Sequence, residues 1–242
     1  MSGVLEFVIS HPYLFATLPL LAAVILLPWL APNRDYRRAA VFSGLACLPG
    51  FLAEITYTEY WRPVLLGGMR CGVEDLLFSY STGVLAWLTA SLWSLEGCAV
   101  GIRSYRIALL RSLPWVLATA AADVGLWFAG LDRLTAGLLS SAGLLLFLLG
   151  RRASLWRLAL AGLVSFTLVY LLIVKLDFAV WPNFVSYWNA DGLWGSLVFG
   201  IPRGEVAWAA VFGAVWPVVI ASALDIRFDS RNSPAPSRTA LA

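Results

Sequence analysis

Seven long apolar segments constrain the fold of this chain more than any other feature of its sequence. A helix of about 20 mostly apolar residues crosses the roughly 30 Å hydrocarbon core of a bilayer. Only 13% of the 242 residues are charged, compared with about 25% in soluble domains. We therefore predict an all-α, polytopic integral membrane protein with seven transmembrane helices. The segments are residues 13–31, 39–57, 73–95, 113–130, 134–150, 158–176 and 196–224, the last long enough to tilt or break near Pro202.

The distribution of basic residues predicts the orientation, because cytoplasmic loops carry an excess of Lys and Arg. One side, with the tail, holds twelve: Arg34, Arg37, Arg38, Arg103, Arg106, Arg111, Arg151, Arg152, Arg157, Arg227, Arg231 and Arg238. The opposite side holds five: Arg62, Arg70, Arg133, Lys175 and Arg203. We therefore expect a multi-pass protein of the plasma membrane with its N-terminus outside and its C-terminus inside.

The two ends of the chain carry weaker signals. The stretch MSGVLEFVISHPYLF lacks a basic leader and a small-residue cleavage site, so it is not expected to be a cleavable signal. Residues 229–242 are small, polar and Pro-containing, and we expect this tail to be disordered.

Two stretches of the chain share one layout, which favours an internal duplication. Residues 59–88 and 186–216 each begin near a Tyr-Trp pair (Tyr60-Trp61 and Tyr187-Trp188), followed by a Gly-containing loop and a carboxylate that opens a long apolar helix. With seven helices, the third and seventh enter the membrane from the same side, so the repeat is parallel. We expect a first copy over residues 1–112, a connecting helix over 113–133 and a second copy over 134–228.

Four acidic residues are the candidates for chemistry. Glu74 and Asp75 lie in the first turn of the third predicted helix, Glu205 lies in the corresponding turn of the seventh, and Glu54 lies inside the second. An ionisable group within a membrane costs a few kcal/mol and is by default a functional candidate. Because apolar surroundings and a neighbouring carboxyl both favour the protonated form, one of Glu74 and Asp75 is expected to hold a proton at neutral pH.

Structural roles remain open for the same acids. Residues in a helix's first turn interact favourably with the helix dipole. Glu74 is also spaced to pair with Arg70, Glu205 is close to Arg203, and Glu54 would be satisfied by a hydrogen bond to a neighbouring helix. Other charged residues are expected to be structural: Asp123 paired with Arg133 or reaching towards the interface, Lys175 and Asp177 as a solvated pair, and His11 at the surface.

Six aromatic residues accompany the acids in the two repeated stretches. An aromatic face stabilises a desolvated cation by about 2 kcal/mol or more. A protonated acid beside such faces suits protonation of an isoprenoid double bond followed by cyclisation. These residues are therefore predicted to contact substrate: Trp61, Phe78, Trp87, Trp188, Trp208 and Trp216.

Neither a cofactor nor a nucleic-acid partner is expected. The three cysteines and the single histidine show no metal-ligand spacing. Dinucleotide and triphosphate motifs do not occur, and the arginines fall in loops between apolar segments.

Two short motifs resemble the paired P-x-E-[ED]-x-x-F signatures of the membrane-integral lycopene cyclase domain. These motifs are CGVEDLLF (71–78) and GIPRGEVAW (200–208). That domain occurs as small two-subunit cyclases in bacteria and as fused tandem copies in archaea and fungi. The resemblance covers residues 10–95 and 134–228. It implies conversion of linear carotenoid ends to rings, without net oxidation or reduction and without flavin motifs.

The match is partial in both motifs. Glu74, Asp75 and Phe78 agree with the first signature, but Gly72 stands in place of its proline. In the second, Pro202 and Glu205 agree, while Gly204 replaces the first acid and Trp208 replaces the phenylalanine.

The resulting hypothesis is a lycopene cyclase-like isomerase, an intramolecular lyase that acts on a carotenoid. Glu74 is expected to donate the proton, and Glu205 to act as the base or as an electrostatic stabiliser. The alternatives are a cyclase of another polyprenyl substrate, or a non-enzymatic lipid-binding or transport protein. A transporter would have broken helices with ion-binding backbone at mid-membrane, and only Pro49-Gly50 and Pro202 hint at such breaks. The sequence makes no prediction of the oligomeric state.

Overall fold

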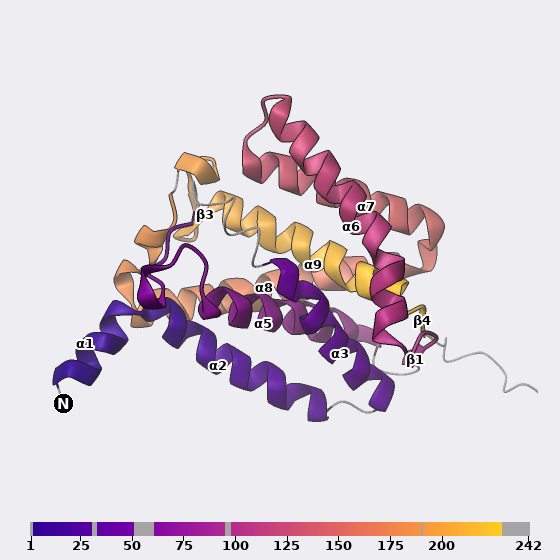
Figure 1. Cartoon of the computed structure of the whole chain (residues 1–242), viewed down its shortest axis with the longest axis horizontal. Helices are drawn as coiled ribbons and strands as arrows, with labels where there is room; N and C mark the ends of the chain where they lie inside the picture. Colours follow the sequence, from indigo (N-terminus) through magenta and orange to yellow (C-terminus); the bar gives the residue numbers. More distant parts are fainter. Residues whose placement is uncertain (1, 31–32, 51–60, 95–97, 190, 229–242) are drawn as a thin grey trace, which may run out of the picture.

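The computed structural model describes residues 2–30, 33–50, 61–94, 98–189 and 191–228. This part of the chain is mostly helical (Figure 1). Its α-helices are α1 (Ser2–Ser10), α2 (Pro12–Leu26), α3 (Arg34–Cys47), α5 (Val73–Ser91), α6 (Tyr105–Phe128), α7 (Arg133–Arg151), α8 (Trp156–Val180) and α9 (Arg203–Ala223).

Short elements connect these helices. The 3-10 helices are η1 (Leu27–Leu30), η2 (Leu48–Gly50), η3 (Leu66–Gly68), η4 (Leu92–Ser94), η5 (Ala153–Leu155), η6 (Pro182–Tyr187) and η7 (Asp191–Leu193). The strands form two antiparallel pairs, β1 (Cys98–Val100) with β4 (Ile226–Phe228) and β2 (Leu197–Val198) with β3 (Ile201–Pro202).

Five helical segments are long and apolar enough to cross a membrane: Pro12–Trp29, Tyr105–Phe128, Arg133–Arg151, Ala153–Val180 and Arg203–Ala223. These segments are compatible with the predicted all-α membrane protein. The other two predicted segments overlap α3 and α5. Helix α3 ends at Cys47, and residues 51–57 of its predicted segment lie outside the described residues. Helix α5 begins with two carboxylates and is enclosed by α2, α3, α8 and α9.

The structure divides one predicted segment, corrects the start of another helix and adds a helix. The predicted segment 196–224 breaks at Pro202, the position where a break was expected as one possibility: β2 and β3 form a hairpin before it, and α9 starts at Arg203. Pro202 lacks the N–H that a helix interior requires, so it stands at the N-cap. Helix α6 begins at Tyr105 instead of residue 113, where the Ser104 side chain accepts a hydrogen bond from the N–H of Ile107. Helix α1 was not predicted.

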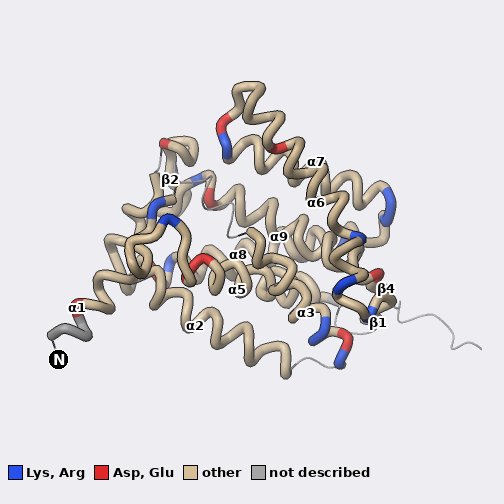
Figure 2. Tube along the Cα trace, in the orientation of Figure 1, with Lys and Arg blue, Asp and Glu red and all other residues tan. Residues whose placement is uncertain are grey.

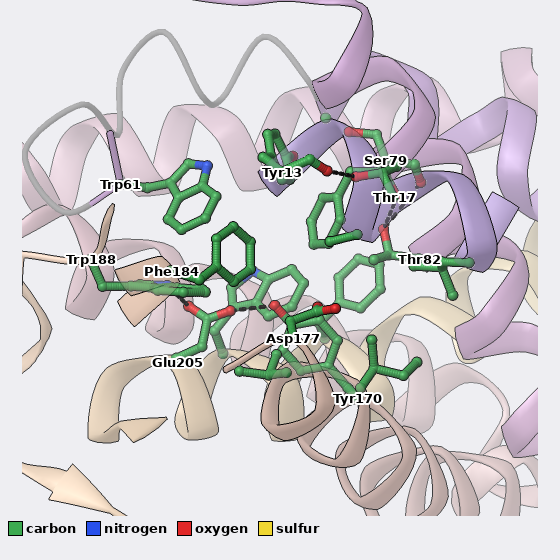
Figure 3. A pocket seen from close by; sticks show the side chains of 18 of the residues that line it. Tyr13, Thr17, Trp61, Ser79, Thr82, Tyr170, Asp177, Phe184, Trp188 and Glu205 are labelled. Atoms are coloured by element: carbon green, nitrogen blue, oxygen red, sulfur yellow. Dashed lines mark hydrogen bonds between the residues drawn. The ribbon is translucent and has the colours of Figure 1, made fainter. Parts of the chain in front are cut away.

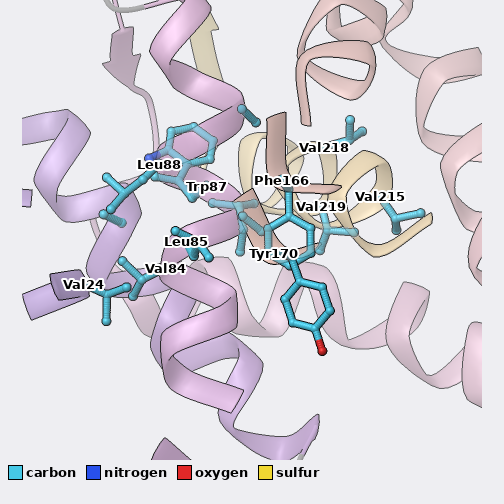
Figure 4. Close-up of a cluster of buried hydrophobic side chains, with 14 of the residues drawn as sticks. Val24, Val84, Leu85, Trp87, Leu88, Phe166, Tyr170, Val215, Val218 and Val219 are labelled. Carbon is cyan, nitrogen blue, oxygen red and sulfur yellow. The ribbon is translucent and has the colours of Figure 1, made fainter. Parts of the chain in front are cut away.

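Helices α5 and α9 lie at the centre of the bundle, and most of their residues are buried. Helix α5 packs against α2 and α3, and α9 packs against α7 and α8. The two central helices contact each other, and α5 also packs against α8 (Figure 1). Val84, Trp87, Phe166 and Val218 fill the shared core (Figure 4).

The described members of the two predicted basic groups lie at opposite ends of the bundle (Figure 2), and Arg231 and Arg238 lie outside the described residues. At one end, the Arg152 guanidinium donates hydrogen bonds to the carbonyls of Ala221 and Ile226. At the other end, Trp61 and Trp188 form an antiparallel bridge, and the Arg62 N–H donates to the Tyr187 carbonyl at 2.9 Å. Trp61 and Trp188, the tryptophans of the proposed repeat, therefore lie side by side.

Two glycines set the register between α8 and α9. A Cβ added at Gly162 would overlap the carbonyl oxygen of Gly213, so the two backbones cross where neither residue has a side chain. Small residues allow this close approach of helices in membranes. Tyr170 lies eight residues after Gly162 on α8, and Glu205 lies eight residues before Gly213 on α9. The side chains of Tyr170 and Glu205 meet there. The crossing therefore aligns these two side chains.

Candidate functional site

A cavity of about 240 Å³ lies between α2, α5, α8 and α9 (Figure 3). Each helix supplies side chains at three- or four-residue spacing, which places them on one face. Helix α2 contributes Tyr13, Ala16, Thr17 and Leu20; α8 contributes Tyr170, Ile173, Val174 and Asp177; α5 contributes Phe78, Ser79 and Thr82; and α9 contributes Glu205, Trp208 and Phe212. Figure 3 shows Glu205, Tyr170 and Asp177 on one side, and Tyr13, Thr17, Ser79 and Thr82 on the other.

Glu205 is the buried carboxyl of this cavity, with only 7% of its surface exposed. The Tyr170 hydroxyl donates a hydrogen bond to Oε1, and the Trp188 indole N–H donates to Oε2 at 3.1 Å. Both carboxyl oxygens are therefore held in place. The alternative pairing with Arg203 does not form, because that guanidinium lies over the ring of Trp194 instead.

The residue at the helix N-cap explains why the carboxyl groups of Glu205 and Asp75 differ in orientation. Each is the third residue of its helix, the position from which a side chain reaches back to the N-cap N–H. Asp75 makes this bond, accepting from the N–H of Gly72 at 2.8 Å. Pro202 has no N–H, so the Glu205 carboxyl is not used as a cap and faces the cavity.

Aromatic rings close the cavity at the end where Trp61 and Trp188 meet. The rings of Trp61 and Trp188 lie 4.3 Å apart, and Phe184 lies 5.4 Å from Trp188. Deeper along α9, Trp208 and Phe212 stack at 5.1 Å, and Tyr170 lies 5.3 Å from Trp208. The carboxyl of Glu205 is therefore placed among faces that can stabilise a cation.

Asp177 is a second carboxyl on the cavity wall, and the sequence interpretation missed it. The expected solvated pair with Lys175 is not formed in the described chain, because the Lys175 ammonium donates to the Phe199 carbonyl at 2.8 Å. Asp177 is half-buried, in the last turn of α8.

Glu74 and Asp75 are not among the residues that line the cavity. Both are buried at the start of α5, with 0% and 1% exposure. Glu74 Oε1 accepts the N–H of Leu66 at 2.7 Å, and Glu74 forms no ion pair with Arg70 in the described chain. The structure thus gives both acids hydrogen-bonding roles around the start of α5, and Glu54 lies outside the described residues.

The predicted aromatic contacts divide into two groups. Trp61, Phe78, Trp188 and Trp208 line the cavity. Trp87 is fully buried in the core between helices, 6.3 Å from the Tyr36 ring, and does not line it (Figure 4). Trp216 borders a second cavity of about 330 Å³ between α6, α7 and α9, and its indole N–H donates to Ser43 Oγ at 2.9 Å.

Asp123 also borders the second cavity. Its carboxylate lies 3.3 Å from the Arg133 guanidinium, so the expected pairing of these two residues is confirmed.

Comparisons with known proteins leave the family open. The chain matches no protein-family model, no curated protein and no solved structure. Within the described part of the chain, no group of three or more His, Cys, Asp or Glu side chains lies close enough to hold a metal ion.

The structure adds Tyr13, Tyr170 and Asp177 to the candidate site. The signal for the two α8 residues was present as a periodic stripe: Tyr170, Ile173, Val174 and Asp177 follow the i, i+3, i+4, i+7 spacing of one helical face. The sequence did not say which helix faces lie against each other.

Proposed function

We propose that this protein is an integral membrane isomerase that protonates and cyclises the end of an isoprenoid chain, with a carotenoid of the lycopene type as substrate. The observation that carries the proposal is the Glu205 carboxyl, buried and fixed by Tyr170 and Trp188 in an aromatic cavity. The partial motifs 71–78 and 200–208 favour the same function, since Phe78, Glu205 and Trp208 from them share this cavity.

The size of the cavity suits one end of a long substrate. Its volume of about 240 Å³ lies just below the roughly 300–1,000 Å³ of pockets that enclose drug-sized ligands. A carotenoid would place only its terminal isoprene units here, with the remaining polyene in contact with the helices or lipid. A shorter polyprenyl chain would fit the same cavity and is the alternative substrate.

The chemistry requires one proton to be added and another removed. Addition to the terminal double bond leaves a tertiary cation, which the rings of Trp61, Trp188 and Trp208 stabilise. The next double bond attacks this cation and closes the ring. Glu205 then accepts a proton from the carbon beside the relocated charge, and that C–H pair becomes the ring double bond. The product is an isomer of the substrate.

We extend the proposal to topology: seven spans, built as a parallel repeat in which α2, α3 and α5 correspond to α7, α8 and α9, with α6 as the connector. The equivalent packing of α5 and α9 supports it. The N-terminus is outside and the C-terminus inside.

Reporter fusions test this threading. Fusions after residues 35, 105 and 155 are expected to report the inside and a fusion after residue 65 the outside, because positive loops remain cytoplasmic. An inside report at residue 65 would contradict the orientation.

The test of function is pigment analysis in a host that accumulates lycopene. Expression of the chain is expected to convert lycopene to a product of unchanged mass with one or two rings. A bound but unchanged pigment would favour a lipid-binding protein, and ring formation on shorter prenyl chains alone would favour the alternative substrate.

A further inference from the structure

Asp177 and Glu205 are two carboxyls that face one cavity from different helices. Asp177 lies seven residues after Tyr170 on α8, which is about 10.5 Å along the helix axis and near the same face. Tyr170 is hydrogen-bonded to Glu205. The cavity wall therefore runs from Glu205, through Tyr170, Ile173 and Val174, to Asp177.

The two carboxyls differ in their hydrogen-bond donors. Glu205 accepts one hydrogen bond on each oxygen, and these bonds stabilise the charged carboxylate against its burial, which disfavours the charge. No described residue donates a hydrogen bond to the Asp177 side chain or forms an ion pair with it, and the nearby Lys175 ammonium is bonded to the Phe199 carbonyl. Within the described chain, no hydrogen bond or ion pair stabilises a negative charge at Asp177.

Access to water also differs. Glu205 is buried, whereas Asp177 is half-buried in the last turn of α8, one turn before the helix ends at Val180. A proton donor must be reloaded after each turnover, and Asp177 lines the cavity near the end of its helix while part of its surface stays exposed.

We propose that Asp177 is the catalytic proton donor of this cavity and that Glu205 is the proton acceptor, an inference that rests on the proposed function. The Asp177 O–H bond breaks, its proton forms a C–H bond with the π electrons of the terminal double bond, and a tertiary cation remains. After ring closure, Glu205 takes a proton from the adjacent carbon. Asp177 regains a proton from water and Glu205 returns one, so the step needs no oxidant or reductant.

Asp177→Asn tests the assignment in purified protein in detergent, with lycopene as the probe. The amide keeps the shape and lacks the acidic proton. General acid catalysis contributes about 10²–10⁴-fold, so we expect ring formation to fall at least about 100-fold while polyene binding, followed by its absorption spectrum, is unchanged. Asp177→Glu is expected to recover part of the rate because it restores a carboxyl.

Asp132→Asn is the matched control. Asp132 is an exposed N-cap of α7 that does not line the cavity, and Asn caps a helix equally well. Ring formation at the wild-type rate by Asp177→Asn would overturn the assignment while leaving the proposed function intact. Loss of polyene binding together with activity would also overturn it, because Asp177 would then be a structural residue. Wild-type protein that forms no ring would instead reject both the function and the assignment.

Discussion

Glu205→Gln is expected to lower ring formation by at least about 100-fold, because the amide cannot accept the proton that completes the ring. The variant should remain folded. The amide oxygen still accepts the Trp188 N–H, and the amide NH₂ faces the Tyr170 hydroxyl, which can accept a hydrogen bond as well as donate one. Residual product is expected to carry its double bond at a different position, since another group must remove the proton.

The measurement is chromatography of the pigments from wild type and variant in the lycopene-accumulating host, at equal membrane protein levels. Glu6→Gln, on the exposed side of α1, is the matched control. Glu74→Gln tests whether ring formation depends on Glu74, the acid predicted from the motif, or on Glu205, the carboxyl found in the cavity. Loss of ring formation in Glu74→Gln, with normal activity in Glu205→Gln, would favour the acid predicted from the motif over the carboxyl found in the cavity.

Gly162→Val is expected to abolish the folded protein or to lower its melting temperature by several degrees. The added side chain would occupy the position of the Gly213 carbonyl, and overpacking of this kind costs about 1–3 kcal/mol or more. Separation of α8 from α9 would also move Tyr170 away from Glu205, so any surviving protein is expected to lose activity.

Thermal unfolding in detergent measures this effect. Gly143→Val on α7 is the control, because a Cβ at Gly143 meets no atom within 4 Å. Equal melting temperatures for the two variants would contradict the close crossing of α8 and α9.

Helix positions were largely predictable because membrane crossing requires long apolar runs, and those runs are visible in the sequence. Boundaries were less predictable. The apolar residues 196–202 resemble the start of a helix, yet positive φ angles at Phe199 (53°) and Gly200 (79°) turn them into the β2–β3 hairpin. Hydrophobicity does not distinguish such a hairpin from a helix.

Of the candidate site residues named from the repeated stretches, Glu205 and four of the six aromatic residues line the cavity. The orientation of the acids was not predicted, because it depends on single residues at the start of each helix. Gly72 supplies an N–H that Asp75 caps, whereas Pro202 supplies none and leaves Glu205 free to face the cavity. Tyr170 and Asp177 could not be predicted as site residues without knowing which helices lie next to each other.

The central claim is that carboxyls of this cavity exchange protons with a polyene, and solvent deuterium tests it most directly. Purified protein is incubated with lycopene in D₂O without nicotinamide or flavin, and the product is analysed by mass spectrometry and NMR. The account predicts one deuterium per ring, on the carbon that was protonated first. Rings that form without deuterium, or only with an added reductant, would contradict it.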